Sequence, residues 1–256
     1  MSDNESLPIL TVSGAQATLR LNRPAVHNRM VLEDLAFIRN ALRVVNENRK
    51  VRVLVITGTG RTFSSGFNLF NLSDDASADE GNTFESMTDE IENARVVTIA
   101  RLNGPVYGGA TDMVLACDFR IGDNRSRMFM PAARLGLQYY GHAMRRWVSR
   151  LGLGAAKKLF LTACEIDAVE MLRIGYLDQV VEPEQLDQAV EDLAASLLAV
   201  APIPLEGLKQ MLNEVARNEY DDPRAQQWYR RTLGTRDFAE GMRAFAEKRS
   251  PRFAGE

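Results

Sequence analysis

The sequence predicts an α/β fold that ends in a helical C-terminal region. Unbroken apolar runs, of which Val53-Leu54-Val55-Ile56 is the clearest, are typical of strands buried on both faces. Segments with helical spacing alternate with these runs, which favours parallel strands joined by helical crossovers. Beyond about residue 185 the apolar residues recur at helical spacing, so the chain is expected to end in helices.

The elements of the core follow from hydrophobic periodicity and turn residues. Ser13-Gly14 separates two short apolar runs and predicts a hairpin. Asn103-Gly104-Pro105 is a strong turn signal between a buried strand and a short helix. The polar, acidic stretch 72–83 is predicted to be a mobile loop. The predicted strands are 9–12, 15–21, 51–57, 96–102 and 117–122, and the predicted helices are 30–47, 85–94 and 108–116.

Two amphipathic helices are expected near the C-terminus, with apolar positions between Leu186 and Leu197 and between Leu205 and Val215. Ala201-Pro202-Ile203-Pro204 separates them. We therefore predict a core domain over residues 1–195 and a helical region over residues 196–256.

Composition excludes several classes of protein. The chain has 256 residues, of which 45% are hydrophobic and 25% charged, as in an ordinary globular protein. Its net charge of -3 and pI near 5.6 give no general attraction to nucleic acid or to an anionic membrane. The N-terminus carries Asp3 and Glu5 and does not resemble a signal peptide, and no run of about 18 apolar residues suggests a membrane span. A cytoplasmic protein is expected.

Metal and nucleotide motifs are missing from the sequence. Cys117 and Cys164 have no paired or metal-ligand spacing, which indicates free thiols in a reducing compartment. His27 and His142 lie far apart in the sequence, so no metal site is predicted. Gly58-Thr59-Gly60 follows a strand but lacks the third glycine of a dinucleotide-binding loop.

Two glycine-containing loops, 62–69 and 103–112, each follow a buried strand. Ligand sites gather at the carboxyl ends of parallel strands. Backbone N–H groups near Gly66-Phe67 and Gly108-Gly109 could together bind a developing oxyanion, each worth roughly 2.7–4 kcal/mol in the transition state. Asp112 follows Gly109 by three residues and could act as a base beside a carbonyl, or could simply favour the first turn of a helix. The pattern leaves both roles open.

Motifs along the whole chain carry a family resemblance. They are Leu21-Asn22-Arg23-Pro24 with Asn28, Phe63–Leu69, Asn103-Gly104 with Gly108-Gly109, Leu161-Thr162-Ala163 through Val180-Val181, and Gly241–Phe245 with Lys248–Pro251. In these motifs the chain resembles the crotonase (enoyl-CoA hydratase/isomerase) family.

The resemblance implies a spiral of β-β-α units, a C-terminal helical trimerisation region, and homotrimers or dimers of trimers. It implies an acyl-CoA substrate, no further cofactor, and a thioester enolate held by the N–H groups of Phe67 and Gly109. It also implies that Lys248 meets a CoA phosphate, although a solvated helix end explains this lysine equally well. The residues implied to line the CoA channel are Val26, His27, Ser65, Gly66, Asn68, Leu69 and Gly108.

The reaction is less sharply indicated. Hydratases of the family use two glutamates, which fall at Asp112 and Ala132 here, and alanine cannot transfer a proton. The dehalogenase nucleophile would fall near Tyr140, which disfavours that chemistry. Among the branches of the family, the chain most resembles the methylmalonyl-CoA decarboxylases. Tyr139 falls at the position where these enzymes have an active-site tyrosine. Phe67 departs from the resemblance, because these enzymes have histidine at its position.

We therefore expect a lyase (decarboxylase-like) or an isomerase. Tyr139 has the alternative role of filling core space. The alternative functions are a hydratase that uses Asp112 alone and a non-catalytic binding protein. RNA binding by such a protein is disfavoured by the acidic pI. A serine protease that shares the spiral fold is a further alternative.

Overall fold

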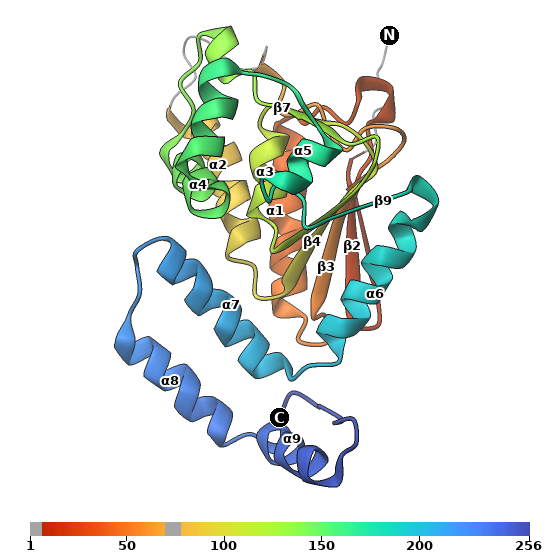
Figure 1. Cartoon of the computed structure of the whole chain (residues 1–256), viewed down its shortest axis with the longest axis vertical. Helices are drawn as coiled ribbons and strands as arrows, with labels where there is room; N and C mark the ends of the chain where they lie inside the picture. The colour runs from red at the N-terminus through yellow and green to blue at the C-terminus, as the bar shows by residue number, and fades with distance from the viewer. Residues whose placement is uncertain (1–6, 70–77) are drawn as a thin grey trace.

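The computed structural model describes residues 7–69 and 78–256 and contains a layered α/β core with a helical extension (Figure 1). The main sheet has the strand order β1-β2-β3-β4-β6-β9. Its first two strands pair antiparallel, as the predicted hairpin requires, and the remaining neighbours pair parallel. Its strands are β1 (Ile9–Ser13), β2 (Gln16–Leu21), β3 (Val53–Gly58), β4 (Val97–Leu102), β6 (Phe119–Asp123) and β9 (Gln179–Val181).

Side chains of β3 alternate between the two faces of the sheet and divide the core into two layers. Val53 and Val55 pack with α6 (Leu186–Leu198), whereas Leu54 and Ile56 belong to the larger cluster that includes α1 (Leu32–Glu47) and α3 (Ala110–Ala116). The unbroken apolar run of this strand is explained by burial on both faces.

The core helices α1, α3, α6 and α2 (Ala78–Glu92) overlap predicted helices. The helices α4 (Gly141–Thr162) and α5 (Ala168–Arg173) were not predicted, and short 3-10 turns lie at Pro24–Val26, Ala132–Leu135 and Pro183–Gln185. Residues 72–77 of the predicted acidic loop lie outside the described residues. The loop prediction is wrong for residues 78–83, which form the start of α2. Sequence polarity alone does not separate a helix from a loop.

A second, smaller sheet holds the loop that precedes α3. It pairs β5 (Val106–Tyr107), β7 (Arg127–Phe129) and β8 (Ile166–Asp167) in the order β5-β7-β8. The N–H of Gly108 donates to the carbonyl of Phe129 at 2.9 Å. These strands were not predicted, because two or three residues carry too little periodicity to identify a strand.

The C-terminal helices α7 (Pro202–Ala216), α8 (Asp222–Leu233) and α9 (Arg236–Glu247) extend away from the sheet (Figure 1). They expose large apolar side chains, including Leu212 at 68% and Phe245 at 81%. The predicted boundary after residue 195 falls inside α6, so the division into two regions stays a prediction, as does their role in a trimer.

Within the described ranges no single helix is long and apolar enough to cross a membrane. Segments 183–198 and 202–216 are long and apolar enough only when they are counted together, and they are bent by 107° relative to each other. This comparison considers length and composition alone.

Candidate active site

Two asparagine side chains fix the stem of the first glycine loop. Asn28 Nδ2 donates to the carbonyl oxygens of Thr62 at 2.8 Å and Phe63 at 3.1 Å. Asn103 Oδ1 accepts from the N–H of Gly58 at 3.1 Å, and its Nδ2 also reaches the Thr62 carbonyl. Asn28 and Asn103 therefore hold the backbone that leads into the first glycine loop. This role explains why both sequence motifs have asparagine at these positions.

The two glycine loops pack against each other through their backbones. Gly66 has φ +90°, and a Cβ there would lie 2.8 Å from the carbonyl oxygen of Tyr107 and 3.0 Å from the nitrogen of Gly109. Only glycine permits this approach without displacement. The structure thus brings together the two loops that the sequence placed at neighbouring strand ends.

The predicted donor residues, Phe67 and Gly109, both line one cavity. Met30 pairs with the neighbours of Phe67, giving its N–H to the carbonyl of Gly66 and accepting from the N–H of Asn68, both at 2.9 Å. In this pairing the N–H of Phe67 points away from Met30. Neither it nor the N–H of Gly109 has an acceptor among the residues that the structure describes. Two such N–H groups can donate to one oxygen atom.

The cavity has a volume of about 890 Å³, within the usual range for small-molecule sites. Six residues predicted from the sequence line it: Ser65, Phe67, Leu69, Gly108, Gly109 and Tyr139. Ala132 lies on its wall, so the place that the resemblance gives to a second glutamate carries only a methyl group. The sequence missed other lining residues, among them Phe84, Glu85, Tyr107 and Tyr140.

Other residues predicted to bind CoA do not line this cavity. Val26 and His27 lie beside the first loop, where Ser65 donates its N–H to the His27 carbonyl at 2.9 Å and its hydroxyl to the Val26 carbonyl at 3.4 Å. Gly66 and Asn68 support the loop backbone. Lys248 ends α9, at the end of the molecule opposite α3 in Figure 1. CoA contacts by these residues stay a prediction.

Asp112 is fully buried and does not line the cavity. Its Oδ2 accepts from the hydroxyl of Tyr140 at 2.8 Å and from Arg146 at 2.6 Å, and its Oδ1 accepts from the indole N–H of Trp147 at 3.1 Å. Burial raises the pKa of the Asp112 carboxyl, while Arg146 and Tyr140 act in the opposite direction. A carboxylate with both oxygens engaged is poorly placed to take a proton from a ligand in the cavity, so this geometry disfavours the predicted role as base.

Arg146 joins three helices through buried ion pairs. Besides Asp112 of α3, its guanidinium contacts Asp89 at 2.6 Å and Glu92 at 3.2 Å, both on α2. Burial lowers the pKa of Arg146, but these carboxylates raise it more, so the pKa of the guanidinium lies above its ordinary value. The cluster fixes α2, α3 and α4 relative to one another. No sequence spacing predicted this arrangement, because its members come from three separate elements.

Tyr139 and Tyr140 connect Asp112 to the cavity. Their rings stack with centroids 4.3 Å apart, and the Tyr139 hydroxyl lies 3.2 Å from that of Tyr140. Burial, and next the Asp112 charge, raise the pKa of both phenols well above the ordinary value, so both hydroxyls are neutral. The hydroxyl of Tyr140 donates to Asp112 and accepts from the hydroxyl of Tyr139. Tyr139 therefore presents oxygen lone pairs, rather than a proton, to the cavity.

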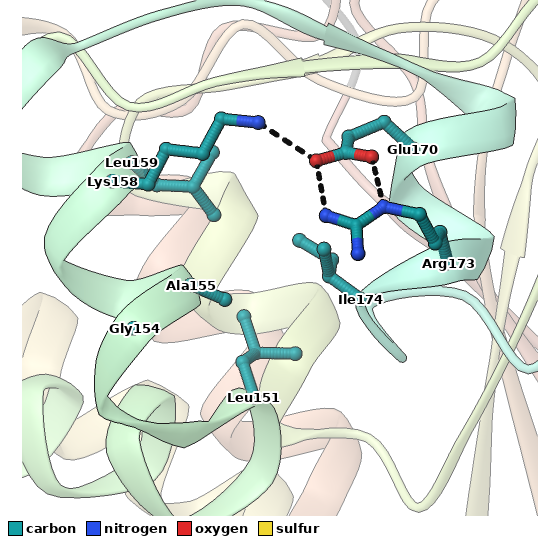
Figure 2. Close-up of a pocket in the computed structure, with 8 residues that line it drawn as sticks. All are labelled: Leu151, Gly154, Ala155, Lys158, Leu159, Glu170, Arg173 and Ile174. Carbon is teal, nitrogen blue, oxygen red and sulfur yellow. Dashed lines mark hydrogen bonds and ion pairs between the residues drawn. The ribbon is translucent and has the colours of Figure 1, made fainter.

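A second, smaller cavity of about 360 Å³ lies between α4 and α5 (Figure 2). Its charged residues pair with one another: Lys158 Nζ lies 2.8 Å and Arg173 Nε 2.5 Å from the carboxylate oxygens of Glu170. Leu151 and Ile174 supply apolar wall. The two cations share the single carboxylate of Glu170, so this cavity offers a ligand no charged group that lacks an ion-pair partner.

Comparison with known proteins places this fold in an enzyme family. The Enoyl-CoA hydratase/isomerase family model matches residues 12–256. The chain is 32% identical to the crotonyl-CoA hydratase of Syntrophomonas wolfei, over 93% of this chain and 94% of the relative. It is 26% identical to the trans-2-decenoyl-[acyl-carrier-protein] isomerase of Streptococcus mutans, over 97% and 98%.

Among solved structures, an enoyl-CoA hydratase from Bacillus anthracis superposes with a TM-score of 0.91 at 25% identity, covering 98% of this chain and 100% of that one. The chain therefore belongs to the enoyl-CoA hydratase/isomerase family. It is an enzyme of that family, which acts on acyl-CoA substrates, and the predicted crotonase fold is confirmed.

Proposed function

We propose that this enzyme moves the carbon–carbon double bond of an enoyl-CoA through a thioester enolate. The observation that carries the proposal is the cavity beside Phe67 and Gly109, which pairs two unengaged N–H groups with an apolar wall and no pair of carboxylates. Migration of a double bond requires removal of one proton and return of one proton. A single proton-transfer group can perform both steps.

The enolate oxygen would be bound by the backbone N–H groups of Phe67 and Gly109. Loss of one such donor typically costs roughly 2.7–4 kcal/mol of transition-state stabilisation. The N–H of Gly109 also belongs to the N-terminus of α3, where the helix dipole favours negative charge. Both effects grow as charge moves onto the thioester oxygen, so they accelerate enolate formation rather than mere binding.

Hydration by two carboxylates is disfavoured by two features of the site. Ala132 supplies no proton-transfer group, and both oxygens of Asp112 already accept hydrogen bonds from buried donors. Hydration with one carboxylate is nevertheless the second candidate, because two of the similar proteins are named crotonyl-CoA hydratase and short-chain-enoyl-CoA hydratase. The second of these, from Clostridium acetobutylicum, is 28% identical over 94% of this chain.

Decarboxylation, which the sequence favoured, is less well supported. The described residues that line the cavity include no lysine, arginine or histidine to bind a substrate carboxylate. Tyr139 offers lone pairs, which repel such a group. The apolar wall instead suits an uncharged acyl chain.

The test is incubation of the enzyme with 3-enoyl-, 2-enoyl- and methylmalonyl-CoA, followed by mass and chromatographic identification of the products. We expect interconversion of the 2- and 3-enoyl thioesters without change of mass. A gain of one water would favour the hydratase. Loss of CO2 from methylmalonyl-CoA would overturn the proposal in favour of the decarboxylase.

A further inference from the structure

One carboxylate does lie on the cavity wall. Glu85, in the middle of α2, is the one charged side chain among the described residues that line the cavity. It is 19% exposed, so it is accessible from the cavity without being fully solvated. Sequence motifs gave no reason to single it out, because α2 follows the acidic stretch and carries several other carboxylates.

The neighbouring residue, Phe84, positions this part of α2 against the two glycine loops. Its ring centroid lies 6.0 Å from that of Phe67. A Cβ on Gly109 would come within 2.9 Å of the same ring, so the ring rests directly on the second loop. Glu85, the next residue of α2, lines the same cavity as Phe67 and Gly109.

One oxygen of Glu85 is held and the other is unengaged. Its Oε1 accepts the backbone N–H of His142 at 3.2 Å. That N–H belongs to the first turn of α4, where no partner exists within the helix and the dipole stabilises a negative charge. Its Oε2 has no partner in the part of the chain that the structure describes, whereas both oxygens of Asp112 do.

The imidazole of His142 supports the same carboxylate from the solvent side. Its Nδ1 lies 3.6 Å from Glu85 Oε1 and contacts the carboxylate of Asp89. Asp89 in turn pairs with Arg146 at 2.6 Å. These backing groups hold one oxygen of Glu85, and the residue itself lines the cavity.

We propose that Glu85 is the catalytic proton-transfer residue, an inference that rests on the proposed enolate chemistry. Its carboxylate takes a proton from C2 of a 3-enoyl thioester, and the electron pair of that C–H bond moves onto the thioester oxygen as a dienolate. The same carboxyl group then returns the proton at C4, which leaves the 2-enoyl thioester. No oxidant, reductant or second reactant is consumed.

A structural role for Glu85 as a cap of α4 is the alternative, and Glu85→Gln separates the two. Glutamine keeps the acceptor for the His142 N–H but cannot take a proton at neutral pH. We expect kcat for isomerisation to fall at least about 100-fold, the low end for general base catalysis, with KM and the urea midpoint close to wild type. Glu90→Gln is the matched control, because Glu90 lies on α2 but pairs with Arg39 at the surface.

Deuterium uptake at C2 of a saturated acyl-CoA, measured in D2O, gives a second readout that does not need isomerisation. Exchange by wild type and Glu90→Gln but not by Glu85→Gln supports the assignment, even if no double bond moves and the proposed function fails. Isomerisation by wild type with Glu85→Gln within about threefold of it overturns the assignment and leaves the function standing. Unfolding of Glu85→Gln in parallel with its loss of activity, or no exchange by wild type, also overturns it.

Discussion

Replacement of Asp112 by alanine tests whether this residue is a base or a structural anchor. In the structure its carboxylate is fully buried and accepts from Tyr140, Arg146 and Trp147. Alanine removes all three contacts together. The tyrosine hydroxyl and the indole N–H then lose their acceptor, and Arg146 loses one of its carboxylates.

The expected loss of stability can be bounded from these contacts. Removal of one partner of a buried ion pair costs roughly 3–5 kcal/mol. In the variant, Arg146 still pairs with Asp89 at 2.6 Å and with Glu92 at 3.2 Å. These ion pairs limit the free-energy cost of keeping the guanidinium charge buried. The indole N–H of Trp147 has no second acceptor among the described residues. A buried donor without an acceptor costs about 1–3 kcal/mol. We expect a decrease of about 3–4 kcal/mol in the free energy of unfolding.

The assay is urea unfolding of Asp112→Ala and wild type at equal protein concentration, alongside enoyl-CoA turnover. A structural anchor predicts a lower midpoint at an unchanged slope, together with a reduction in activity through disorder of Tyr139 and Tyr140. An unchanged midpoint combined with a loss of about 100-fold or more in kcat would refute the reasoning and restore Asp112 as the base.

Three further predictions concern other parts of the chain. Gly66→Ala should cost about 1–3 kcal/mol and abolish turnover, because φ is +90° and its Cβ would lie 2.8 Å from a carbonyl of the second loop; wild-type stability and activity in this variant would contradict the site geometry. Burial raises the pKa of Cys117 to about 12, so a maleimide at pH 7 should label Cys164 alone in the folded enzyme and both thiols in urea; double labelling of the native protein is the contrary result. The hydrogen bond from Arg249 lowers the pKa of Glu240 from 4.5 to about 2, so this contact contributes fully above about pH 4.5 and is lost as the pH falls toward 2. Amide exchange at residues 249–256 should rise over that interval in wild type, and an equal rise in Glu240→Gln would argue against the contact.

The sequence by itself determined the fold class and the two loops of the site. The apolar run of β3 and the turn residues around Gly104 determine local backbone structure. The strand and the turn can therefore be predicted without knowledge of partners that are distant in the chain. Gly66 and Gly109 were informative for the same reason. Each lies where a neighbouring group comes too close for a Cβ atom, so the residue type itself indicates the close contact.

Only the tertiary structure decided the chemistry of the charged groups. The sequence placed Asp112 beside the second loop, but its partner Arg146 comes from α4, and contacts with Trp147 and Tyr140 engage both carboxylate oxygens, which disfavours the predicted role as base. Glu85 reaches the cavity because Phe84 packs onto the loops, a contact between elements distant in the chain. Whether a carboxylate can transfer a proton depends on its desolvation, its partners and its access to the ligand. These are properties of the assembled core, and no spacing along the chain encodes them.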